Sequence, residues 1–436
     1  MLSVLKNRTY RHLFTAQVIA LVGTGLMTVA LGLLAYELAG ADAGAVLGSA
    51  LAIKMLAYVG VAPVAQAFAD QFPRRSLLVA LDLVRAVVAI CLPFVTEVWQ
   101  IYLLIFVLQA ASAGFTPTFQ ATIPDILPDE EDYTKALSLS RLAYDLESLI
   151  SPMLAAALLT VISFHNLFAG TVLGFLVSAA LVVSVRLPTT IPGPRRGIWD
   201  RTTRGTRIYL ATPRLRGLLA ISLAVSAAGA MVIVNTVVLV KARFGLGEVE
   251  VASALAAFGG GSMVAAFVLP SLLEKVADRT AMLTGATVLV VGTGIGALLP
   301  SYALLLPLWL IIGFGYSVAQ TPSGRLLRRS AHAEDRPAIF AAHFALSHAC
   351  WLICYPLAGR FGAVMGLPST FIVMSLVGLA GVALTLWLWP ASDPSDVAHD
   401  HPSLPPDHSH LRTHADQGRH HHQLILDDLH RIWPKG

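Results

Sequence analysis

Long apolar stretches, separated by short polar segments, fill most of this chain of 436 residues. Each stretch holds roughly 20 residues, the length that a helix needs to cross the hydrocarbon core of a bilayer. Twelve such stretches can be placed, at residues 12–38, 45–69, 76–96, 100–123, 137–163, 166–187, 214–240, 249–273, 281–300, 302–324, 338–364 and 368–390. The pattern predicts an all-α membrane protein with twelve transmembrane helices.

The composition excludes an ordinary soluble protein. Hydrophobic residues make up 56% of the chain, charged residues only 13%, and the mean hydropathy is +0.70. Too few polar side chains are present to cover a water-facing globule of this size. A formal net charge of +4 can indicate nucleic-acid binding, but here the basic residues lie in the short loops between apolar stretches. We therefore expect the lipid bilayer as a partner, and no nucleic acid.

The basic residues are concentrated in alternate loops. Three of them lie between positions 6 and 11, before the first apolar stretch; Arg74 and Arg75 follow the second stretch, and four arginines between positions 325 and 336 follow the tenth. These loops fall on one side of the membrane if all twelve stretches cross it. Since cytoplasmic loops are enriched in Lys and Arg, both termini are predicted to be cytoplasmic.

The chain divides into two halves that echo each other. Residues 188–213 are rich in Pro, Gly, Thr and Arg, which predicts a cytoplasmic basic linker between residues 1–187 and residues 214–391. AFADQFPRRSLL recurs loosely as KVADRTAML, and GFTPTFQATIP as GFGYSVAQTP, each about 200 residues later in the order expected of an internally repeated transporter. The echo predicts two six-helix bundles with a substrate path between them.

Residues 392–436 form a polar tail that is rich in histidine. Nine of the fourteen histidines of the chain fall in it, and eight of them are candidate metal ligands: His399, His401, His408, His410, His414, His420, His421 and His422. Pairs of imidazoles spaced H-x-H chelate borderline divalent cations. The tail is therefore predicted to concentrate or sense metal ions at the cytoplasmic mouth, the alternative being a tail that is His-rich by chance.

Charged side chains within the fifth stretch are costly in a membrane and need a reason. As a helix, RLAYDLESLISP places Arg141 and Asp145 on one stripe, where they can neutralise each other, and Glu147 on a different face. Glu147 is thus a candidate for carrying a proton or binding a cation on the path. The alternative is that both carboxylates cap or gate the cytoplasmic end of the helix.

The eleventh stretch contains imidazoles and thiols. His343, Ser347, Cys350 and Cys354 fall on one helical face, while His348 is turned about 140° away from His343. Imidazole suits Ni²⁺, Zn²⁺ and Cu²⁺, so His343 or His348, with Cys350 as a weaker candidate, could combine with a carboxylate of the fifth stretch in a transient metal site. The alternative is that these residues pack helices together.

The twelve stretches, the basic central linker and the segment between the second and third stretches resemble the major facilitator superfamily. In that segment Asp70, Arg74 and Arg75 resemble the signature loop of the family, and Asp82 and Arg85 follow in the third stretch. The resemblance implies the major facilitator fold and a cytoplasmic gate formed by these five residues. For Asp82 and Arg85, three apart on one helix, the alternative is simple mutual neutralisation.

The His-rich tail and SHACWLICYP in the eleventh stretch are similar to the NreB-type nickel-resistance exporters. This resemblance implies efflux of Ni²⁺ from the cytoplasm, with Co²⁺ or Zn²⁺ as further substrates, by proton antiport and alternating access. The implied partners are a divalent metal ion and protons, with no permanently bound cofactor.

No phosphate-binding GxxxxGK[ST] motif occurs, so an ion gradient rather than ATP hydrolysis in this chain is expected to drive transport. The sequence thus predicts a secondary transporter, not an enzyme, that is a monomer in the cytoplasmic (inner) membrane. Two alternatives stay open: an exporter of an organic compound such as a drug or siderophore, and a membrane metal sensor or buffer.

Overall fold

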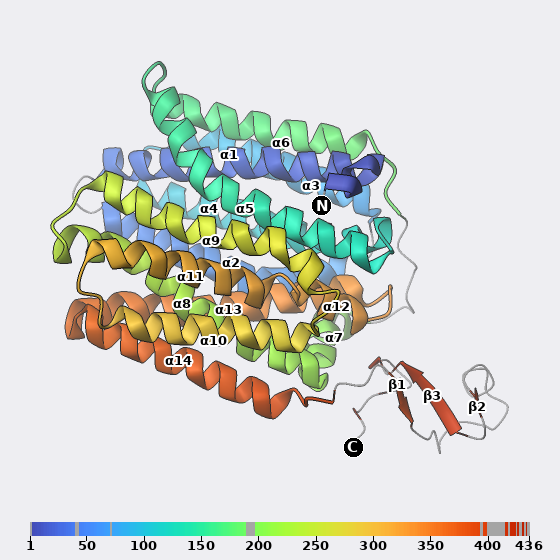
Figure 1. Ribbon diagram of the computed structural model, residues 1–436. Helices are drawn as coiled ribbons and strands as arrows, with labels where there is room; N and C mark the ends of the chain where they lie inside the picture. The colour runs from blue at the N-terminus through green and yellow to red at the C-terminus, as the bar shows by residue number, and fades with distance from the viewer. Residues whose placement is uncertain are drawn as a thin grey trace.

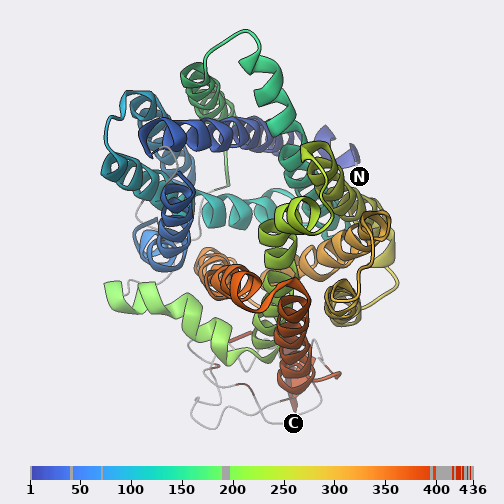
Figure 2. The ribbon, with the colours of Figure 1, turned by 90° about the vertical axis from the view of Figure 1, so that its left-hand side faces the viewer.

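The computed structural model describes residues 2–39, 43–69, 72–188 and 197–392, and in the tail residues 396–398, 415–416, 419–423, 425–426, 430 and 433. Long helices dominate these residues and lie side by side, those before α7 on one side and those after it on the other (Figures 1 and 2). Three short strands follow in the tail.

The N-terminal bundle consists of six long helices and three 3-10 turns. Its elements are η1 (Leu2–Lys6), α1 (Arg8–Ala39), α2 (Ala43–Ala69), α3 (Arg74–Cys91), η3 (Leu92–Phe94), α4 (Val98–Ile126), α5 (Glu130–Leu159), η4 (Phe164–Asn166) and α6 (Leu167–Val183). Asp129 begins α5 as its N-cap, because its carboxylate accepts a hydrogen bond from the backbone N–H of Asp132 at 3.0 Å.

The predicted linker contains a helix, and a second long-helix bundle follows it. The linker helix is α7 (Ile198–Ala211), and the second bundle contains α8 (Pro213–Val238), the π-helical turn η5 (Leu239–Arg243), α9 (Glu248–Leu272), α10 (Asp278–Gly296), α11 (Tyr302–Gln320), α12 (Ser323–Arg329), α13 (Arg336–Met365) and α14 (Leu367–Leu388). Gly366, at a φ of 78°, makes the sharp turn between α13 and α14, a conformation that favours glycine.

Each of the twelve predicted apolar stretches coincides with a helix. By length and apolarity, ten helices among the described residues could cross a membrane. The two long helices outside that set are α5, which carries seven charged residues between Glu130 and Glu147, and α10, which is rich in Gly and Thr. A count of twelve spans and cytoplasmic termini stay predictions.

The two bundles use corresponding helix pairs, as the sequence echo leads one to expect. In the N-terminal bundle α1 packs on α6, α2 on α4, and α3 on both α4 and α6. In the C-terminal bundle α8 packs on α14, α9 on α11, and α10 on both α11 and α14. Because each half repeats one arrangement of six helices, the contacts between the halves can change without repacking either bundle.

Glycines bring several of these pairs into very close contact. A Cβ on Gly261 of α9 would lie 1.8 Å from the carbonyl O of Leu310 on α11, and a Cβ on Gly313 of α11 would lie 1.8 Å from that of Phe258 on α9. The two backbones therefore touch where a side chain would stand. Small residues commonly permit such approach in membrane bundles, where van der Waals packing replaces the hydrophobic effect as the main attraction between helices.

The tail strands form a small antiparallel sheet in the order β1-β3-β2. They are β1 (Asp396–Ala398), β2 (Ala415–Asp416) and β3 (Arg419–Gln423). Val397 pairs with His422, and Ala415 with His420, so the central strand contains the run of three consecutive histidines. The sheet lies beyond the end of the bundle where α7 and α12 are found (Figure 1).

We expect Gly261→Ala to destabilise the C-terminal bundle by about 1–3 kcal/mol, because its Cβ would force α9 away from α11. The control is Gly260→Ala at the preceding residue. There, no atom outside the local helix backbone lies within 4 Å of the Cβ position. Thermal unfolding of the purified protein in detergent, followed by circular dichroism, measures the difference. Equal melting temperatures for the two variants would contradict the packing described above.

Candidate functional site

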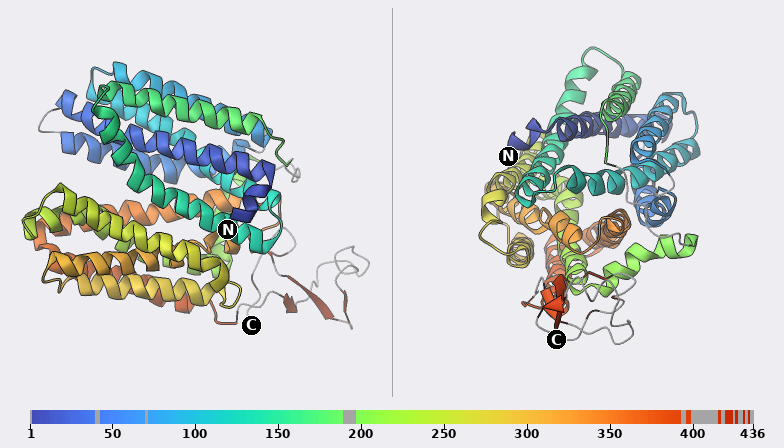
Figure 3. Two further views of the ribbon diagram at one scale, coloured as in Figure 1. Left: turned by 45° about the horizontal axis from the view of Figure 1, so that its top comes forward. Right: turned by 90° about the vertical axis from the view of Figure 1, so that its right-hand side faces the viewer.

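The two bundles meet along α2, α5, α9 and α13, and two of these helices, α5 and α13, carry six of the predicted site residues. Helix α5 packs on α9, and α2 packs on α13, so each contact joins a helix of one bundle to a helix of the other. Figure 3 shows the N-terminal helices, in blue to green, facing the C-terminal helices, in yellow to red. Side chains on the inner faces of α5 and α13 therefore lie between the halves, where a transporter of this construction binds its substrate.

Arg141 connects the halves in the interior of the bundle. Its Nη2 lies 2.6 Å from Oδ1 of Asp145, one helical turn further along α5, which confirms the predicted pairing. Its Nε also donates to Oγ of Ser262 on α9 at 3.1 Å, and its Nη1 to Oε1 of Gln320 on α11 at 3.0 Å. The guanidinium carbon stands 4.7 Å from the centre of the Tyr316 ring. These three partners lie more than 100 residues away along the chain, and no sequence pattern predicts the contacts.

Glu147 has a different environment from Asp145, as the helical spacing predicted. Its carboxylate lies against α1, since a Cβ on Gly25 would stand 2.6 Å from Oε1 of Glu147 and 2.2 Å from Oγ of Ser151. Its charge interacts with that of Lys54 on α2, but among the described residues it forms no ion pair. A half-buried carboxylate that is only weakly compensated can exchange a proton or a cation more readily than Asp145, which Arg141 holds at close range.

His348 faces the N-terminal bundle. The edge of its ring meets Tyr58 of α2, with ring centres 4.8 Å apart, and its Nδ1 lies 2.7 Å from the carbonyl O of Phe344. The Lys54 ammonium stands 5.6 Å from the centre of the same Tyr58 ring. We call Lys54, Tyr58, Glu147 and His348 the central cluster. Its members come from α2, α5 and α13.

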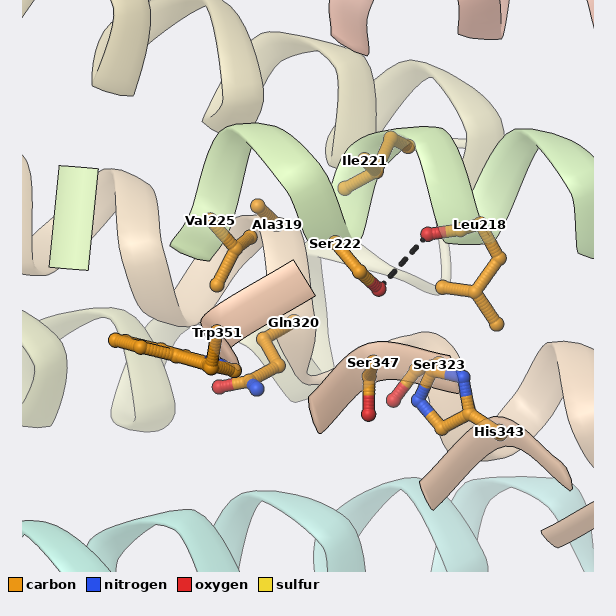
Figure 4. A pocket seen from close by; sticks show the side chains of 10 residues that line it. All are labelled: Leu218, Ile221, Ser222, Val225, Ala319, Gln320, Ser323, His343, Ser347 and Trp351. Carbon is orange, nitrogen blue, oxygen red and sulfur yellow. Dashed lines mark hydrogen bonds between the residues drawn. The ribbon is translucent and has the colours of Figure 1, made fainter. Parts of the chain in front are cut away.

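His343 faces away from the central cluster, as expected from its angular separation from His348. Its Nδ1 shares a hydrogen bond of 3.0 Å with the hydroxyl of Tyr209 on α7. It also lines a pocket within the C-terminal bundle, together with Leu218, Ile221, Ser222, Val225, Ala319, Gln320, Ser323, Ser347 and Trp351 (Figure 4). Gln320 belongs both to this pocket and to the partners of Arg141.

The two cysteines of α13 do not join His343 in the pocket. Cys350 is 8% exposed and Cys354 is fully buried in the hydrophobic core of the C-terminal bundle. Both thiols are free. Their burial among packed helices favours the packing interpretation, and metal ligation by Cys350 stays a prediction.

No group of three or more His, Cys, Asp or Glu side chains that could hold a metal ion occurs in the part of the chain that the structure describes. The five tail candidates His399, His401, His408, His410 and His414 lie outside the described residues. His420, His421 and His422 are placed only by the backbone of β3. A metal site in the path or in the tail therefore stays a prediction.

Ion pairs join the halves at one end of the bundle. Asp125, at the end of α4, accepts from Arg74 of its own half at 2.5 Å and from Arg336 of α13 at 2.8 Å. Arg325 of α12 lies 2.6 Å from the carboxylate of Glu130 on α5. We call this the charged end; the positive-inside rule predicts that it is cytoplasmic. Neither acid belongs to the site residues that the sequence predicts.

The predicted gate residues divide into two groups. Arg74 takes part in the contact at the charged end, and Arg75 donates to the carbonyl O of Val183 within the N-terminal half. Asp70 lies outside the described residues. For Asp82 and Arg85 the structure favours mutual neutralisation, as described next, and a role in gating stays a prediction.

Asp82 and Arg85 form an ion pair on α3 inside the N-terminal bundle. Asp82 also accepts from Oγ of Ser178 on α6 at 2.8 Å. The Arg85 guanidinium carbon lies 4.0 Å from the centre of the Phe115 ring and 4.6 Å from that of Phe175. Each of these partners belongs to the same half, so the pair stabilises one bundle rather than joining two.

Comparison with known proteins agrees with this architecture. The sequence profile of the Major Facilitator Superfamily matches residues 13–216 and 218–415. The chain belongs to this superfamily of secondary transporters. It is accordingly a multi-pass membrane protein and not an enzyme.

The similar curated proteins match only part of the chain. Macrolide efflux protein A of Streptococcus pyogenes is 25% identical over 181 residues, which cover 40% of this chain and 44% of that protein. The protein of the same name from Enterococcus faecalis is 28% identical over 152 residues, covering 33% of this chain and 47% of that protein. An uncharacterized MFS-type transporter, YfiS, of Bacillus subtilis (strain 168) is 27% identical over 127 residues, covering 29% and 30%. The chain thus matches less than half the length of these relatives.

Two solved structures share the fold over most of their length. The human organic anion transporter MFSD10 (TETRAN) superposes with a TM-score of 0.76 at 13% identity, covering 87% of this chain and 99% of that chain. A bacterial homologue of iron transporter ferroportin, in an outward-facing state with soaked iron, gives a TM-score of 0.68 at 15% identity, covering 86% and 97%. At these identities the likeness concerns the fold alone.

We expect Asp125→Asn to shift the protein toward a state that is open at the charged end. Without the carboxylate, Arg74 and Arg336 face each other with like charge. The ratio of open to closed molecules should therefore rise tenfold or more, which corresponds to a free-energy change of about 1.4 kcal/mol. Spin labels on the exposed positions Ser76 and Glu334, in a background without the native cysteines, report the separation of the halves.

The control is Glu131→Gln, which removes an ion pair to Lys135 within α5 and leaves the contact between the halves intact. A distance distribution that is the same in both variants would show that Asp125 does not hold this end closed.

Proposed function

We propose that this chain exports a divalent transition-metal ion, Ni²⁺ in the first place and Co²⁺ or Zn²⁺ in addition, from the cytoplasm across the inner membrane in exchange for protons. The observation that carries the proposal is the position of Glu147, a half-buried carboxylate between α5 and α1, next to the helices that join the two halves. A membrane carboxylate in such a place is a functional-site candidate by default.

Alternating access supplies the transport cycle. The contacts of Arg141 in the interior and of Asp125 at the charged end both cross from one half to the other. Breaking and remaking these polar contacts would let each six-helix bundle rock as a unit, since the contacts within each bundle need not change. The names of the macrolide efflux relatives support export as the direction.

Glu147 is the group we assign to ion exchange. With Lys54 acting on it, the empty carboxylate is partly compensated. A proton that enters from outside would neutralise Glu147, and its release to the cytoplasmic side would free the carboxylate for a metal ion. His348 lies across the interface, near Tyr58 and Lys54, and its second ring nitrogen would offer the borderline donor that such ions prefer.

The tail supports a metal substrate over other small ions. Nine histidines in residues 392–436 provide many imidazoles, and three of them are consecutive on β3. A segment of this composition binds Ni²⁺, Zn²⁺ or Cu²⁺ in preference to alkali or alkaline-earth ions. Because the tail cannot cross the bilayer, it would collect metal at the charged end and would not form the translocation site.

Export of an organic compound is the second candidate, and one observation favours it. The pocket within the C-terminal bundle combines apolar and aromatic side chains, such as Ile221 and Trp351, with an equal number of polar ones, such as Gln320 (Figure 4). Such a lining suits an amphipathic molecule better than a hydrated metal ion. The macrolide efflux relatives point to the same class of substrate.

Uptake of radioactive nickel into energised inside-out vesicles tests the proposal, with the intact chain compared with a chain ending at Pro390. We expect accumulation in both that collapses when an uncoupler is added, with a weaker affinity for nickel in the shortened chain. Absence of accumulation in both would overturn nickel export and leave the organic substrate. Accumulation that ignores the uncoupler would overturn proton antiport.

We expect Glu147→Gln to lower proton-driven nickel accumulation more than tenfold, because a neutral amide cannot release a proton. The matched control is Glu37→Gln. Glu37 lies near the C-terminal end of α1, where its side chain is 53% exposed and pairs with His165. Transport by the Glu147 variant at the rate of the parent would remove Glu147 from the mechanism.

A further inference from the structure

The far end of the tail lies against the C-terminal bundle. Leu426 is 3% exposed and belongs to the same hydrophobic cluster as the core of that bundle, and Trp433 packs against this cluster. His430, between them, is 6% exposed. We call Leu426, His430 and Trp433 the docking residues. A polar, histidine-rich tail with no role beyond chelation would not bury Leu426 and His430 and partly bury Trp433.

The surface that receives them is formed where α8 begins and α14 ends. The guanidinium carbon of Arg214, in the first turn of α8, stands 5.0 Å from the centre of the Trp433 ring. Arg214 is itself only 1% exposed, so this cation–π contact is shielded from water, the condition under which such contacts are strongest. Arg214 is one turn before Leu218, which lines the pocket.

The neighbouring part of this surface is fixed by the end of α14. Trp389 is fully buried, and a Cβ on Gly217 of α8 would lie 2.6 Å from the Cβ of Trp389. The backbone carbonyl O of Trp389 accepts a hydrogen bond of 2.9 Å from Nε of Arg279, at the start of α10. Helices α8, α10 and α14 are thus joined at this point, which gives the docking residues a rigid receiving site.

The histidine strand is held from both of its ends. Strand β3 pairs with β1, which begins eight residues after the last residue of α14, with Val397 opposite His422 and Ala398 opposite His421. On its other side β3 ends at Gln423, three residues before Leu426. A segment of three residues spans at most about 11 Å, so a docked Leu426 keeps β3 close to the bundle.

We propose that Leu426, His430 and Trp433 are an intramolecular docking element that seats on the C-terminal bundle at Arg214. By this contact the histidine strand β3 is held at the charged end and moves with the C-terminal half. The partner of the surface around Arg214 is therefore the chain's own tail. This assignment goes beyond the proposed transport function and does not depend on the identity of the substrate.

The position of the element indicates an anchor rather than a brake. The contacts described for Trp433 and for the turn around Trp389 are made to helices of the C-terminal half, and the contacts that join the halves are made elsewhere, at Arg141 and Asp125. Docking therefore leaves rocking of the two bundles free. It restricts the volume in which the histidines of β3 can move, which raises their effective concentration at the charged end.

Hydrogen–deuterium exchange of the full chain in detergent tests the proposal. In the parent protein we expect the amides of residues 419–423, 425, 426, 430 and 433 to be protected. Trp433→Ala should increase their exchange rate at least tenfold while leaving α8 and α14 unchanged. The matched control is Trp387→Ala: Trp387 is also on the C-terminal half, at the end of α14, and is 78% exposed, so its loss should leave the tail protected.

Leu426→Ala provides a second variant. Because it removes a buried apolar side chain, it should increase the exchange rates of the same residues. Exchange of the parent tail at the rate of an unstructured peptide would overturn the proposal. Retained protection in both Trp433→Ala and Leu426→Ala would overturn it as well. Because the measurement involves no substrate, failure of nickel transport and failure of docking are distinguished.

Discussion

The cost of placing a charge inside an apolar helical bundle governs how the buried charged side chains of this protein are paired. Asp82 and Arg85 neutralise each other within one bundle, and the Arg85 guanidinium is enclosed by aromatic rings. Arg141 and Asp145 form a second pair one helical turn apart. In both pairs a short spacing on one helix compensates the charge before any neighbouring helix is added, so the helices can enter a bilayer without carrying an isolated ion.

The second pair differs from the first because the Arg141 guanidinium has further hydrogen-bond donors that reach the other half. Asp145 accepts from Nη2 and shares Nε with Ser262 of the other half, while Nη1 donates to Gln320 of that half. A residue that is neutralised locally can make and lose such outer contacts without leaving a bare charge behind. This is what a moving interface requires, and Asp125 meets the same requirement at the charged end by accepting from an arginine of each half. Glu147 differs from both because its compensation by Lys54 is indirect.

Glycine packing within the bundles and polar contacts between them divide the structure into rigid and movable parts. Backbones that touch at Gly261 and Gly313 leave no room for independent motion of α9 and α11. The docking residues belong to the rigid part of the C-terminal half, because Trp433 is seated on Arg214. A histidine-rich segment attached in this way would remain at one mouth of the transporter throughout its cycle.

The sequence by itself determined the helices, the two halves and the superfamily, since runs of apolar residues, their period and the signature segment after the second stretch are local properties. Local spacing also determined the Arg141–Asp145 pair and the opposite orientation of His343 and His348. Only the tertiary structure decided which groups meet across long separations: Asp125 with Arg336, Arg141 with Gln320, and Trp433 with Arg214. Those contacts depend on how whole helices are placed beside one another. The periodicity of a single sequence reports which face of a helix is apolar, but not which helix lies next to it.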